Sequence, residues 1–161
     1  MSHHDDEHDV WKIIQDQRIA MLTTVDESGD IVSRPMATLA RPEEHRIYFV
    51  TRTDAKVGQI GGSAKVNLGF ADTRKNTYLS LSGTAHTSQD RDKLRELWSM
   101  FVEAWLPQGP DAPDVALVTV EPEHAKLWDS TSSKLIYAGK VLAAVARQDP
   151  PKGQTVKTVK M

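Results

Sequence analysis

The chain has 161 residues, of which 20 are Lys or Arg and 22 are Asp or Glu, giving a formal net charge of −2 with neutral histidines. A chain of this length is usually one domain, and its charge balance, without a basic cluster before the extreme C-terminus, argues against nucleic acid as a principal partner. The sequence contains no cysteine, which excludes disulfides and thiol chemistry, so any redox function needs a bound cofactor.

The first half of the chain is predicted to be a helix followed by three strands and a short helix. Val10, Ile13 and Ile14 recur at helical spacing, and the β-rich runs after them are separated by turn-forming residues. Thr53 or Asp54 can serve as the N-cap of the short helix. The predicted elements are a helix over 6–17, a hairpin of strands over 18–25 and 31–39, a strand over 46–51, and a helix over 55–60 closed by Gly61-Gly62.

Strands continue through the second half. Val66, Leu68 and Phe70 alternate along one strand, and the next strand, 79–86, has two distinct faces. One face carries apolar or small residues and is expected in the core, whereas the other carries polar residues and is expected to meet water or a ligand. The members of the two faces are Leu79, Leu81, Gly83 and Ala85 on the first, and Ser80, Ser82, Thr84 and His86 on the second.

The longest helix is predicted over 88–106 and ends before Pro107. Its large apolar residues fall on one helical stripe, namely Leu94, Leu97, Trp98, Phe101 and Trp105. Two strands are then predicted, over about 115–121 and 123–129, with a tight join at Glu121-Pro122, and a last helix over about 132–146. The segment Lys152–Met161 alternates valines with lysines. It is expected to be a short terminal strand or a frayed end, with a basic arm as the alternative.

These elements lack the regular alternation of strand and helix that is typical of a doubly wound parallel sheet. We therefore predict a mainly β, α+β fold, built on a mostly antiparallel barrel flanked by helices. Residues 1–161 are predicted to form a single domain, and its ends, about 1–8 and 150–161, are expected to be flexible. Residues 1–9 are polar and acidic, and the longest apolar run near the C-terminus is far too short to cross a bilayer, so a soluble cytoplasmic protein without a membrane partner is expected.

Ser33-Arg34-Pro35-Met36 predicts an anion site beside a broken strand. Proline has no N–H for a sheet ladder, so Pro35 marks an edge or an interruption of pairing. Lys56 falls in the first turn of the predicted short helix, where free N–H groups and the helix dipole favour an anion such as phosphate. The alternative is that Arg34 and Lys56 are ordinary solvated charges that pair with Asp54 or Glu43.

Trp128 falls on the polar face of its predicted strand. The period of two places Ala125 and Leu127 on one face and Trp128 with His124 and Lys126 on the other. A large aromatic side chain there can serve a second subunit or a flat ligand, or it can pack under the last helix. His3, His4 and His8 beside aspartates bind transition metals at most adventitiously, and we predict no metal site.

Several segments together resemble one known family. They are SRPM at 33–36, IYFVT at 47–51, Lys56, LSLSG at 79–83 and WD at 128–129, together with WLPQGPDAPD at 105–114. In order and spacing, over about residues 8–146, they resemble the general stress protein 26-like branch of the pyridoxamine 5'-phosphate oxidase-like FMN-binding split-barrel family. The resemblance implies a split β-barrel, and a homodimer that binds FMN in clefts at the subunit interface.

The resemblance also implies roles for individual residues. Arg34 and Lys56 match positions that hold the FMN phosphate, and Trp128 matches a tryptophan that contacts the flavin. The other cofactor-binding candidates are Pro35 and Met36 along the isoalloxazine edge, Val50 and Thr51 along the ribityl and phosphate path, and Tyr78 and Ser80 in the same cleft. No catalytic residue is assigned.

One segment departs from the true pyridoxamine-phosphate oxidases. Those enzymes follow the tryptophan with arginine and histidine, whereas residues 129–137 contain neither. The leading hypothesis is therefore an FMN-dependent oxidoreductase other than a pyridoxamine-phosphate oxidase, with an unknown small-molecule substrate or electron donor. The alternatives are a non-catalytic flavin-binding general stress or sensor protein, and an enzyme that uses a deazaflavin or haem. The lack of a basic groove disfavours the deazaflavin, and the lack of a placed axial histidine disfavours haem.

Overall fold

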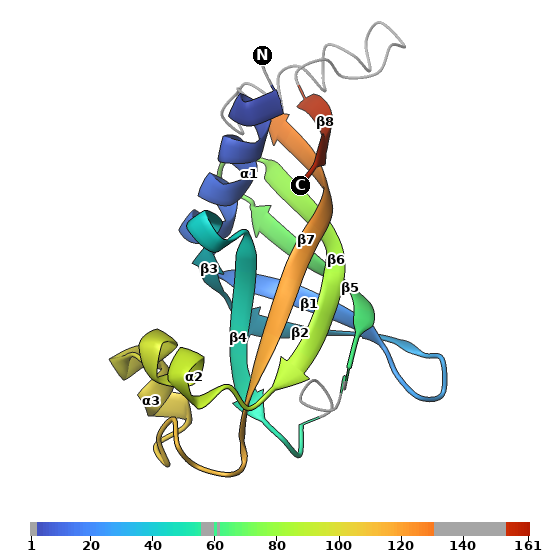
Figure 1. Cartoon of the computed structure of the whole chain (residues 1–161). Helices are drawn as coiled ribbons and strands as arrows, with labels where there is room; N and C mark the ends of the chain where they lie inside the picture. Colours follow the sequence, from blue (N-terminus) through green and yellow to red (C-terminus); the bar gives the residue numbers. More distant parts are fainter. Residues whose placement is uncertain (1–2, 56–59, 61, 131–153) are drawn as a thin grey trace, which may run out of the picture.

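A computed structural model describes residues 3–55, 60, 62–130 and 154–161, and Figure 1 shows the arrangement of their elements. The helical elements are α1 (His3–Gln17), η1 (Pro42–Glu44), α2 (Arg91–Leu97) and α3 (Met100–Trp105). The strands are β1 (Ile19–Val25), β2 (Ile31–Ala37), β3 (Leu39–Arg41), β4 (Arg46–Arg52), β5 (Ala64–Asp72), β6 (Thr77–Ser88), β7 (Val115–Ser130) and β8 (Gln154–Lys160).

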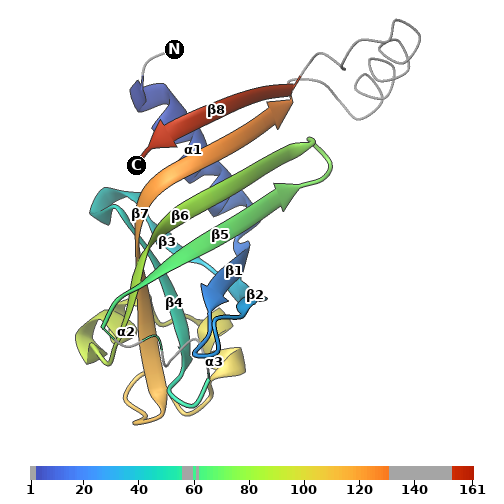
Figure 2. The ribbon, with the colours of Figure 1, turned by 90° about the vertical axis from the view of Figure 1, so that its right-hand side faces the viewer.

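The strands form one curled antiparallel sheet, which confirms the predicted fold class. Their order is β2-β1-β5-β6-β7-β4-β3, and β8 also pairs with β7. In Figure 2 strands β5 to β8 lie in front of α1, and Figure 1 shows α1 at one end of the sheet and α2 with α3 at the other. Of the alternatives for the last residues, the terminal strand is confirmed, because β8 pairs with β7 from His124 to Ser130.

The core fills the hollow side of this sheet. Apolar side chains of α1, among them Val10 and Ile14, pack there against alternate residues of the strands, including Leu22, Phe49 and Leu68. A smaller cluster lies under α2, between the helix and the neighbouring strands β4 and β7. Its members are Tyr48, Leu94, Leu97, Val115 and Leu117.

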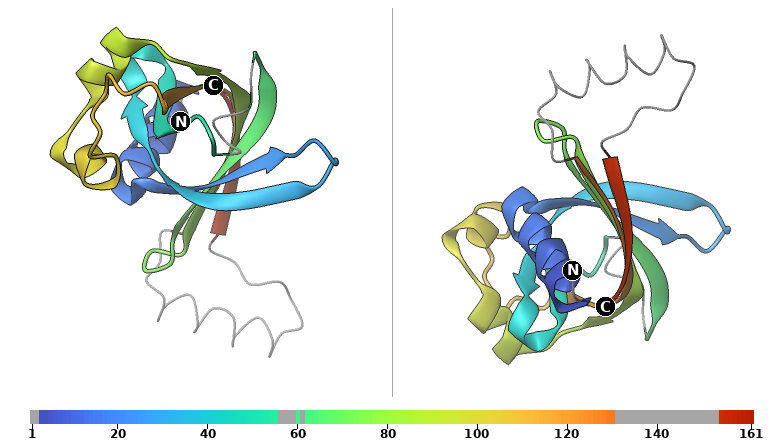
Figure 3. Two further views of the ribbon diagram at one scale, coloured as in Figure 1. Left: turned by 90° about the horizontal axis from the view of Figure 1, so that it is seen from below. Right: turned by 90° about the horizontal axis from the view of Figure 1, so that it is seen from above.

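The hairpin of β1 and β2 is confirmed, and its turn projects beyond the rest of the sheet (Figure 3). In the turn, Asp26 Oδ1 accepts hydrogen bonds from the backbone N–H groups of Ser28 and Asp30 at 2.9 and 3.0 Å. Gly29 has φ +87°, a conformation that costs glycine little. Pro35 lies in β2, which is an edge strand of the described sheet. The edge position is therefore confirmed, but the expected break in the strand is wrong, because β2 pairs with β1 from Ile31 to Ala37 without interruption.

The predicted single helix over 88–106 is wrong, because the chain forms α2 and α3 instead. Trp98 is extended at φ −66°, ψ 130°, and Ser99 caps α3 by accepting a hydrogen bond from the Val102 N–H. Leu94 and Leu97 are buried as expected, but Phe101 is 66% and Trp105 79% exposed. A local N-cap therefore overrides the apolar stripe.

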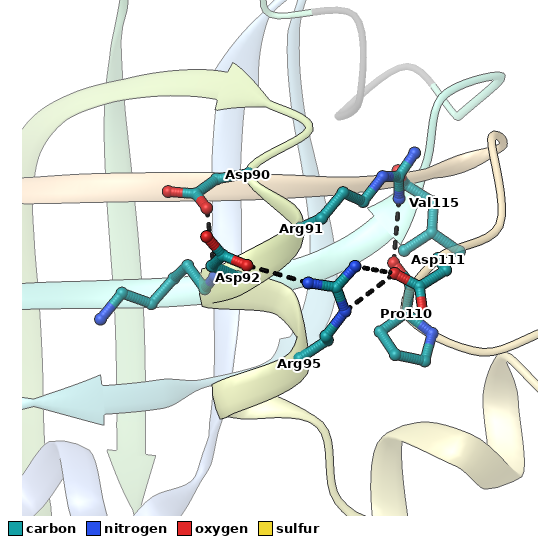
Figure 4. A network of polar contacts seen from close by, with 8 residues as sticks. Asp90, Arg91, Asp92, Arg95, Pro110, Asp111 and Val115 are labelled. Carbon is teal, nitrogen blue, oxygen red and sulfur yellow. Dashed lines mark hydrogen bonds and ion pairs between the residues drawn. The ribbon is translucent and has the colours of Figure 1, made fainter.

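Two arginines fix α2 to the loop before β7 (Figure 4). Arg91 Nη1 donates to the carbonyl oxygens of Pro110 and Val115 at 3.0 and 3.2 Å. Arg95 donates to Asp111 Oδ1 from Nε at 2.9 Å and from Nη2 at 2.6 Å. These contacts hold the loop and the helix together at the end of the sheet remote from α1.

The predicted break at Glu121-Pro122 is also wrong, since β7 is one strand of 16 residues. Pro122 lies at a register shift in the β6–β7 pair, opposite Gly83. On its other edge β7 pairs with β4 as far as Val120 and with β8 from His124. Pro122 therefore occupies a position where the ladder needs no N–H, which is where a strand tolerates proline.

Candidate functional site

The solvent-facing side of β5, β6 and β7 carries several of the predicted site residues, and we name it the outer face. Residues directly opposite each other in an antiparallel pair share a face. Tyr78 is paired with Trp128, and Ser80 with both Gly69 and Lys126. The alternation predicted for β6 is confirmed, because Leu79, Leu81, Gly83 and Ala85 are buried while Tyr78 and Ser82 are exposed.

An aromatic pair with a cation lies at one end of the outer face. Tyr78 is 37% exposed and Trp128 is half-buried. Lys126 Nζ lies 5.4 Å from the centroid of the Trp128 ring, within the range of a cation–π contact. The sequence-based assignment of Trp128 to the polar face is thus confirmed, whereas residues 132–146, the predicted helix that could cover it, lie outside the described residues.

Three hydrogen-bonded polar side chains lie beside Tyr78 and Trp128. Asn67 Nδ2 donates to Ser80 Oγ at 2.8 Å and to Ser82 Oγ at 3.2 Å. Asn67 was not among the predicted site residues. Its position between Val66 and Leu68, two buried residues of β5, already places it on the solvent side by alternation.

The outer face is hollowed on both sides of the crossing of β1 and β5, which pair only from Met21 to Thr23. A hollow of about 440 Å³ is lined by Gln17, Ile19, Met21, Gly69, Phe70 and Ala71. A second, of about 320 Å³, is lined by Thr23, Thr24, Val25, Ile31, Lys65, Val66, Asn67, Ser82, Gly83 and Glu123.

An ion pair borders the second hollow. Lys65 Nζ donates to both carboxylate oxygens of Glu123 at 2.8 Å. These bonds, with a further one from the Thr84 hydroxyl, lower the pKa of Glu123 below its ordinary value. The charge of the Lys65 ammonium group is therefore already balanced by the Glu123 carboxylate.

Arg34 and Met36 lie on the opposite, core side of the sheet. Arg34 is paired with Leu22, which is fully buried, and Met36 with Ala20. The Arg34 side chain is half-buried, and its Nη1 donates to Thr24 Oγ1 at 2.9 Å. Among the described residues it forms no ion pair, neither with Asp54 nor with Glu43. Pro35 points the other way and is exposed.

The other predicted site residues lie on β4 or beyond it. Thr51 is 9% exposed, and Val50 packs against the cluster under α2. The Asp54 carboxylate accepts from Arg52 Nε and Nη2, both at 3.0 Å. Lys56 and most of the predicted helix over 55–60 lie outside the described residues, so the predicted partnership of Arg34 and Lys56 stays a prediction.

Within a single chain, the candidate residues therefore lie in separate places rather than in one site. Tyr78, Ser80 and Trp128 lie together on the outer face, and Pro35 faces the same side from the edge strand. Arg34 and Met36 are directed to the core side of β2, and Val50 and Thr51 belong to β4. Over the part of the chain that the structure describes, no three histidine or acidic side chains gather in a way that could hold a metal ion.

A family model described as Pyridoxamine 5'-phosphate oxidase like matches residues 5–152 of this sequence. The chain belongs to the pyridoxamine 5'-phosphate oxidase-like family. This confirms the resemblance inferred from the motifs. None of the described helices of this family member is long and apolar enough to span a membrane.

Solved structures of other proteins share the fold of this pyridoxamine 5'-phosphate oxidase-like chain. The general stress FMN/FAD binding protein from Xanthomonas citri is 28% identical, with a TM-score of 0.69, covering 81% of this chain and 92% of that one. A second structure is that of a protein from Clostridium acetobutylicum. It is described as related to general stress protein 26 of B. subtilis and as a member of the pyridoxinephosphate oxidase family, and it has a TM-score of 0.69 over 100% of this chain and 97% of that one. Because only 19% of the residues are identical, this similarity supports the fold alone.

A curated relative is longer than this pyridoxamine 5'-phosphate oxidase-like chain. Protein bli-3 of Neurospora crassa is 27% identical over 138 residues, which cover 78% of this chain and 66% of bli-3. The match thus spans slightly less than two thirds of that relative.

Proposed function

We propose that the chain binds FMN in a cleft shared by two copies of itself and works as an FMN-dependent oxidoreductase other than a pyridoxamine-phosphate oxidase. Membership of the family supports a flavin, as does the FMN/FAD binding named for the Xanthomonas citri protein. The absence of arginine and histidine from residues 129–137 supports a substrate other than that of the true oxidases.

The observation that carries the proposal is the environment of Arg34. A guanidinium group that is partly removed from water loses part of its hydration, so a nearby anion stabilises it. Arg34 has only the Thr24 hydroxyl among the described residues. A phosphate suits the remaining N–H donors, since guanidinium groups bind phosphate oxygens through paired, charge-assisted hydrogen bonds.

The division of the candidate residues between two faces supports a homodimer. Arg34 lies on the core side of β2, whereas Trp128 and Tyr78 lie on the outer face of β6 and β7. One flat cofactor cannot contact both sides of the same sheet. A second copy, offering its own outer face to the projecting hairpin of the first, brings the two groups into one cleft. The exposed apolar side chains of the hairpin, Val25 and Ile31, are 62% and 76% exposed and suit such a contact.

Each candidate then has a role suited to its chemistry. Arg34, with Lys56, holds the phosphate, and the aromatic side chains of Trp128 and Tyr78 suit a conjugated ring system. The remaining candidates, Pro35, Met36, Val50, Thr51 and Ser80, position the ring and the ribityl chain. When bound, FMN supplies the group that accepts and releases electrons, while the protein supplies orientation and hydrogen bonds.

The test is the visible absorption spectrum of the purified protein before and after addition of FMN, with any released cofactor identified by mass. A flavin spectrum and release of FMN are expected. A deazaflavin or haem would be recognised by its mass, and the proposal would then be wrong about the identity of the cofactor. A colourless protein that does not respond to FMN would remove the proposal.

A second candidate function is flavin binding without turnover, in a general stress or sensor role. Proton transfer at neutral pH is most often performed by His, Asp or Glu. The described candidate residues Arg34, Pro35, Met36, Val50, Thr51, Tyr78, Ser80 and Trp128 include none of these. Rapid reduction of bound flavin by a nicotinamide nucleotide, followed by repeated turnover with an electron acceptor, would exclude this alternative.

A further inference from the structure

Lys126 is an exposed cation on the outer face. Within the described part of the chain, its ammonium group forms no ion pair, and its recorded contact is the one with the Trp128 ring. Lys65, on the same face, is held by Glu123. A cation–π contact at an exposed site is weak, so the Lys126 ammonium can turn to a stronger, anionic partner.

Two hydroxyl donors face the same region. A serine hydroxyl has one O–H to donate and two lone pairs that accept. Ser80 Oγ and Ser82 Oγ each accept a hydrogen bond from Asn67 Nδ2, and neither O–H has an acceptor recorded among the described residues. Ser80 is the direct cross-strand partner of Lys126. The Asn67 amide thus holds two oxygen atoms whose protons remain available to an incoming acceptor.

We propose that Lys126, Ser80 and Ser82 form a subsite for a carboxylate or phosphate group, beside the aromatic pair of Tyr78 and Trp128. The ammonium group and the two hydroxyls all donate, and oxygen anions accept from donors of this kind. The aromatic side chains next to them favour a planar, apolar remainder of the ligand. The 320 Å³ hollow reaches this subsite, because Asn67 and Ser82 are part of its lining.

The inference rests on the proposed function in one respect, namely the source of the anion. If a flavin occupies the cleft at Trp128, the subsite selects substrates or electron acceptors that carry a negative group. The same donors could instead hold the phosphate of the cofactor itself. Both sources share one chemistry, and competition experiments separate them.

The experiment measures binding of benzoate, an aromatic carboxylate, by ligand-observed NMR, with benzyl alcohol as its uncharged counterpart. The protein is used as purified and again after saturation with FMN. Lys126→Ala is expected to raise the benzoate Kd by about three- to tenfold, as for a charge-assisted hydrogen bond at an exposed position. Binding of benzyl alcohol should not change, and Lys126→Arg should retain benzoate binding.

Lys12→Ala is the matched control, because Lys12 is exposed on α1 and its loss changes the net charge equally. Ser82→Ala, which keeps every charge, is a second variant. It should raise the benzoate Kd by a smaller factor than Lys126→Ala does. Equal benzoate affinity in the wild type and in Lys126→Ala would overturn the inference. An equal loss in Lys12→Ala would overturn it as well, because the effect would then come from overall charge.

The flavin titrations identify the source of the anion. If Lys126→Ala weakens the binding of FMN but not that of riboflavin, and FMN displaces benzoate, the subsite holds the phosphate of the cofactor. If benzoate binds together with FMN and Lys126→Ala affects benzoate alone, the subsite holds the anionic group of a substrate. If no flavin binds but benzoate binding still depends on Lys126, the subsite stands and the proposed function falls.

Discussion

Gly83 lies directly opposite Pro122 at the point where β7 changes its neighbour from β4 to β8. A Cβ atom on Gly83 would lie 2.3 Å from the carbonyl oxygen of Glu121 and 3.2 Å from Pro122 Cα. Both contacts are with backbone atoms, which cannot rotate away as a side chain could. Glycine is therefore required here by the close approach of two strands.

Gly83→Ala is expected to lower the free energy of unfolding by about 1–3 kcal/mol, because the added methyl group forces the two strands apart. The measurement is a urea unfolding curve at neutral pH. Gly69→Ala is the control, since a Cβ there meets its nearest atoms only at 3.9 Å. That variant should stay within about 0.5 kcal/mol of the wild type. Equal stabilities of the two variants would contradict the steric requirement at Gly83.

Arg34→Ala is expected to weaken FMN by about 1.5–3 kcal/mol, as for the loss of charge-assisted hydrogen bonds to a phosphate. Riboflavin, which lacks the phosphate, should bind both proteins alike. Fluorescence titration with each flavin measures the difference. Arg52→Ala serves as the control, because Arg52 is already paired with Asp54. A parallel loss of riboflavin affinity would show that Arg34 supports the fold of the cleft rather than the phosphate.

Mixed pairs of chains test whether one cleft uses both copies. We expect Arg34→Ala and Trp128→Ala each to weaken FMN in homogeneous protein. When the two variants are co-expressed with different tags and the mixed species is isolated, one of its two sites should combine an unaltered Arg34 with an unaltered Trp128. FMN titration of the mixed species should then show one tight site per pair of chains. No recovery would mean that both residues act within the same chain.

Tyr48→Phe tests the polar cluster between β4 and α2. Tyr48 donates to Glu44 Oε2 at 2.5 Å, and Lys93 Nζ donates to Glu44 Oε1 at 2.9 Å. Burial and the bond to Glu44 raise the pKa of Tyr48 to about 12. The pKa of Glu44 is lowered by the bonds from Tyr48 and Lys93. Tyr48→Phe should lower the free energy of unfolding by roughly 1–2 kcal/mol at neutral pH, because one hydrogen bond to a charged acceptor is lost.

The pH dependence of this stabilisation has a definite sign. Since the pKa of Tyr48 is higher in the folded state, its contribution is complete below the unfolded value, about 10, and is lost as the pH rises through about 12. Urea unfolding between pH 8 and pH 11.5 should therefore show a shallower decline for Tyr48→Phe than for the wild type. Tyr78→Phe, at an exposed position, should follow the wild type. Identical slopes for wild type and Tyr48→Phe would contradict the assignment.

The sequence predicted those parts of the fold that depend on local periodicity. Alternation along β6 placed Leu79 and Leu81 in the core, and the same period placed Trp128 on the solvent side. Two errors, at Ser99 and Pro122, depend on compensations that local periodicity does not contain. Ser99 starts α3 through its own side chain, inside a stripe that looked continuous, and Pro122 is accommodated by a glycine of the neighbouring strand. The spacing of the apolar residues predicts neither the cap at Ser99 nor the glycine opposite Pro122.

The sequence proposed candidate site residues one by one, but not their arrangement. Arg34 and Pro35 were proposed from the composition of one strand. The site role of Trp128 came from the family resemblance, because its face alone left packing under the last helix as an alternative. That Arg34 and Trp128 lie on opposite sides of the sheet depends on strand order and register, which no local pattern contains. Lys126 was noted only as a neighbour of Trp128, because the lack of an acidic partner among the described residues is a property of the folded surface.

The pairing of β7 has a consequence for synthesis of the protein. The last described strand, β8, covers the C-terminal half of β7 and adds Val159 to the core. Until that segment has left the ribosome, the edge of β7 from His124 to Ser130 is open, and open strand edges pair readily with other chains. Completion of the sheet must therefore wait until β8 has been synthesised, and termination before β8 would release a polypeptide prone to aggregation.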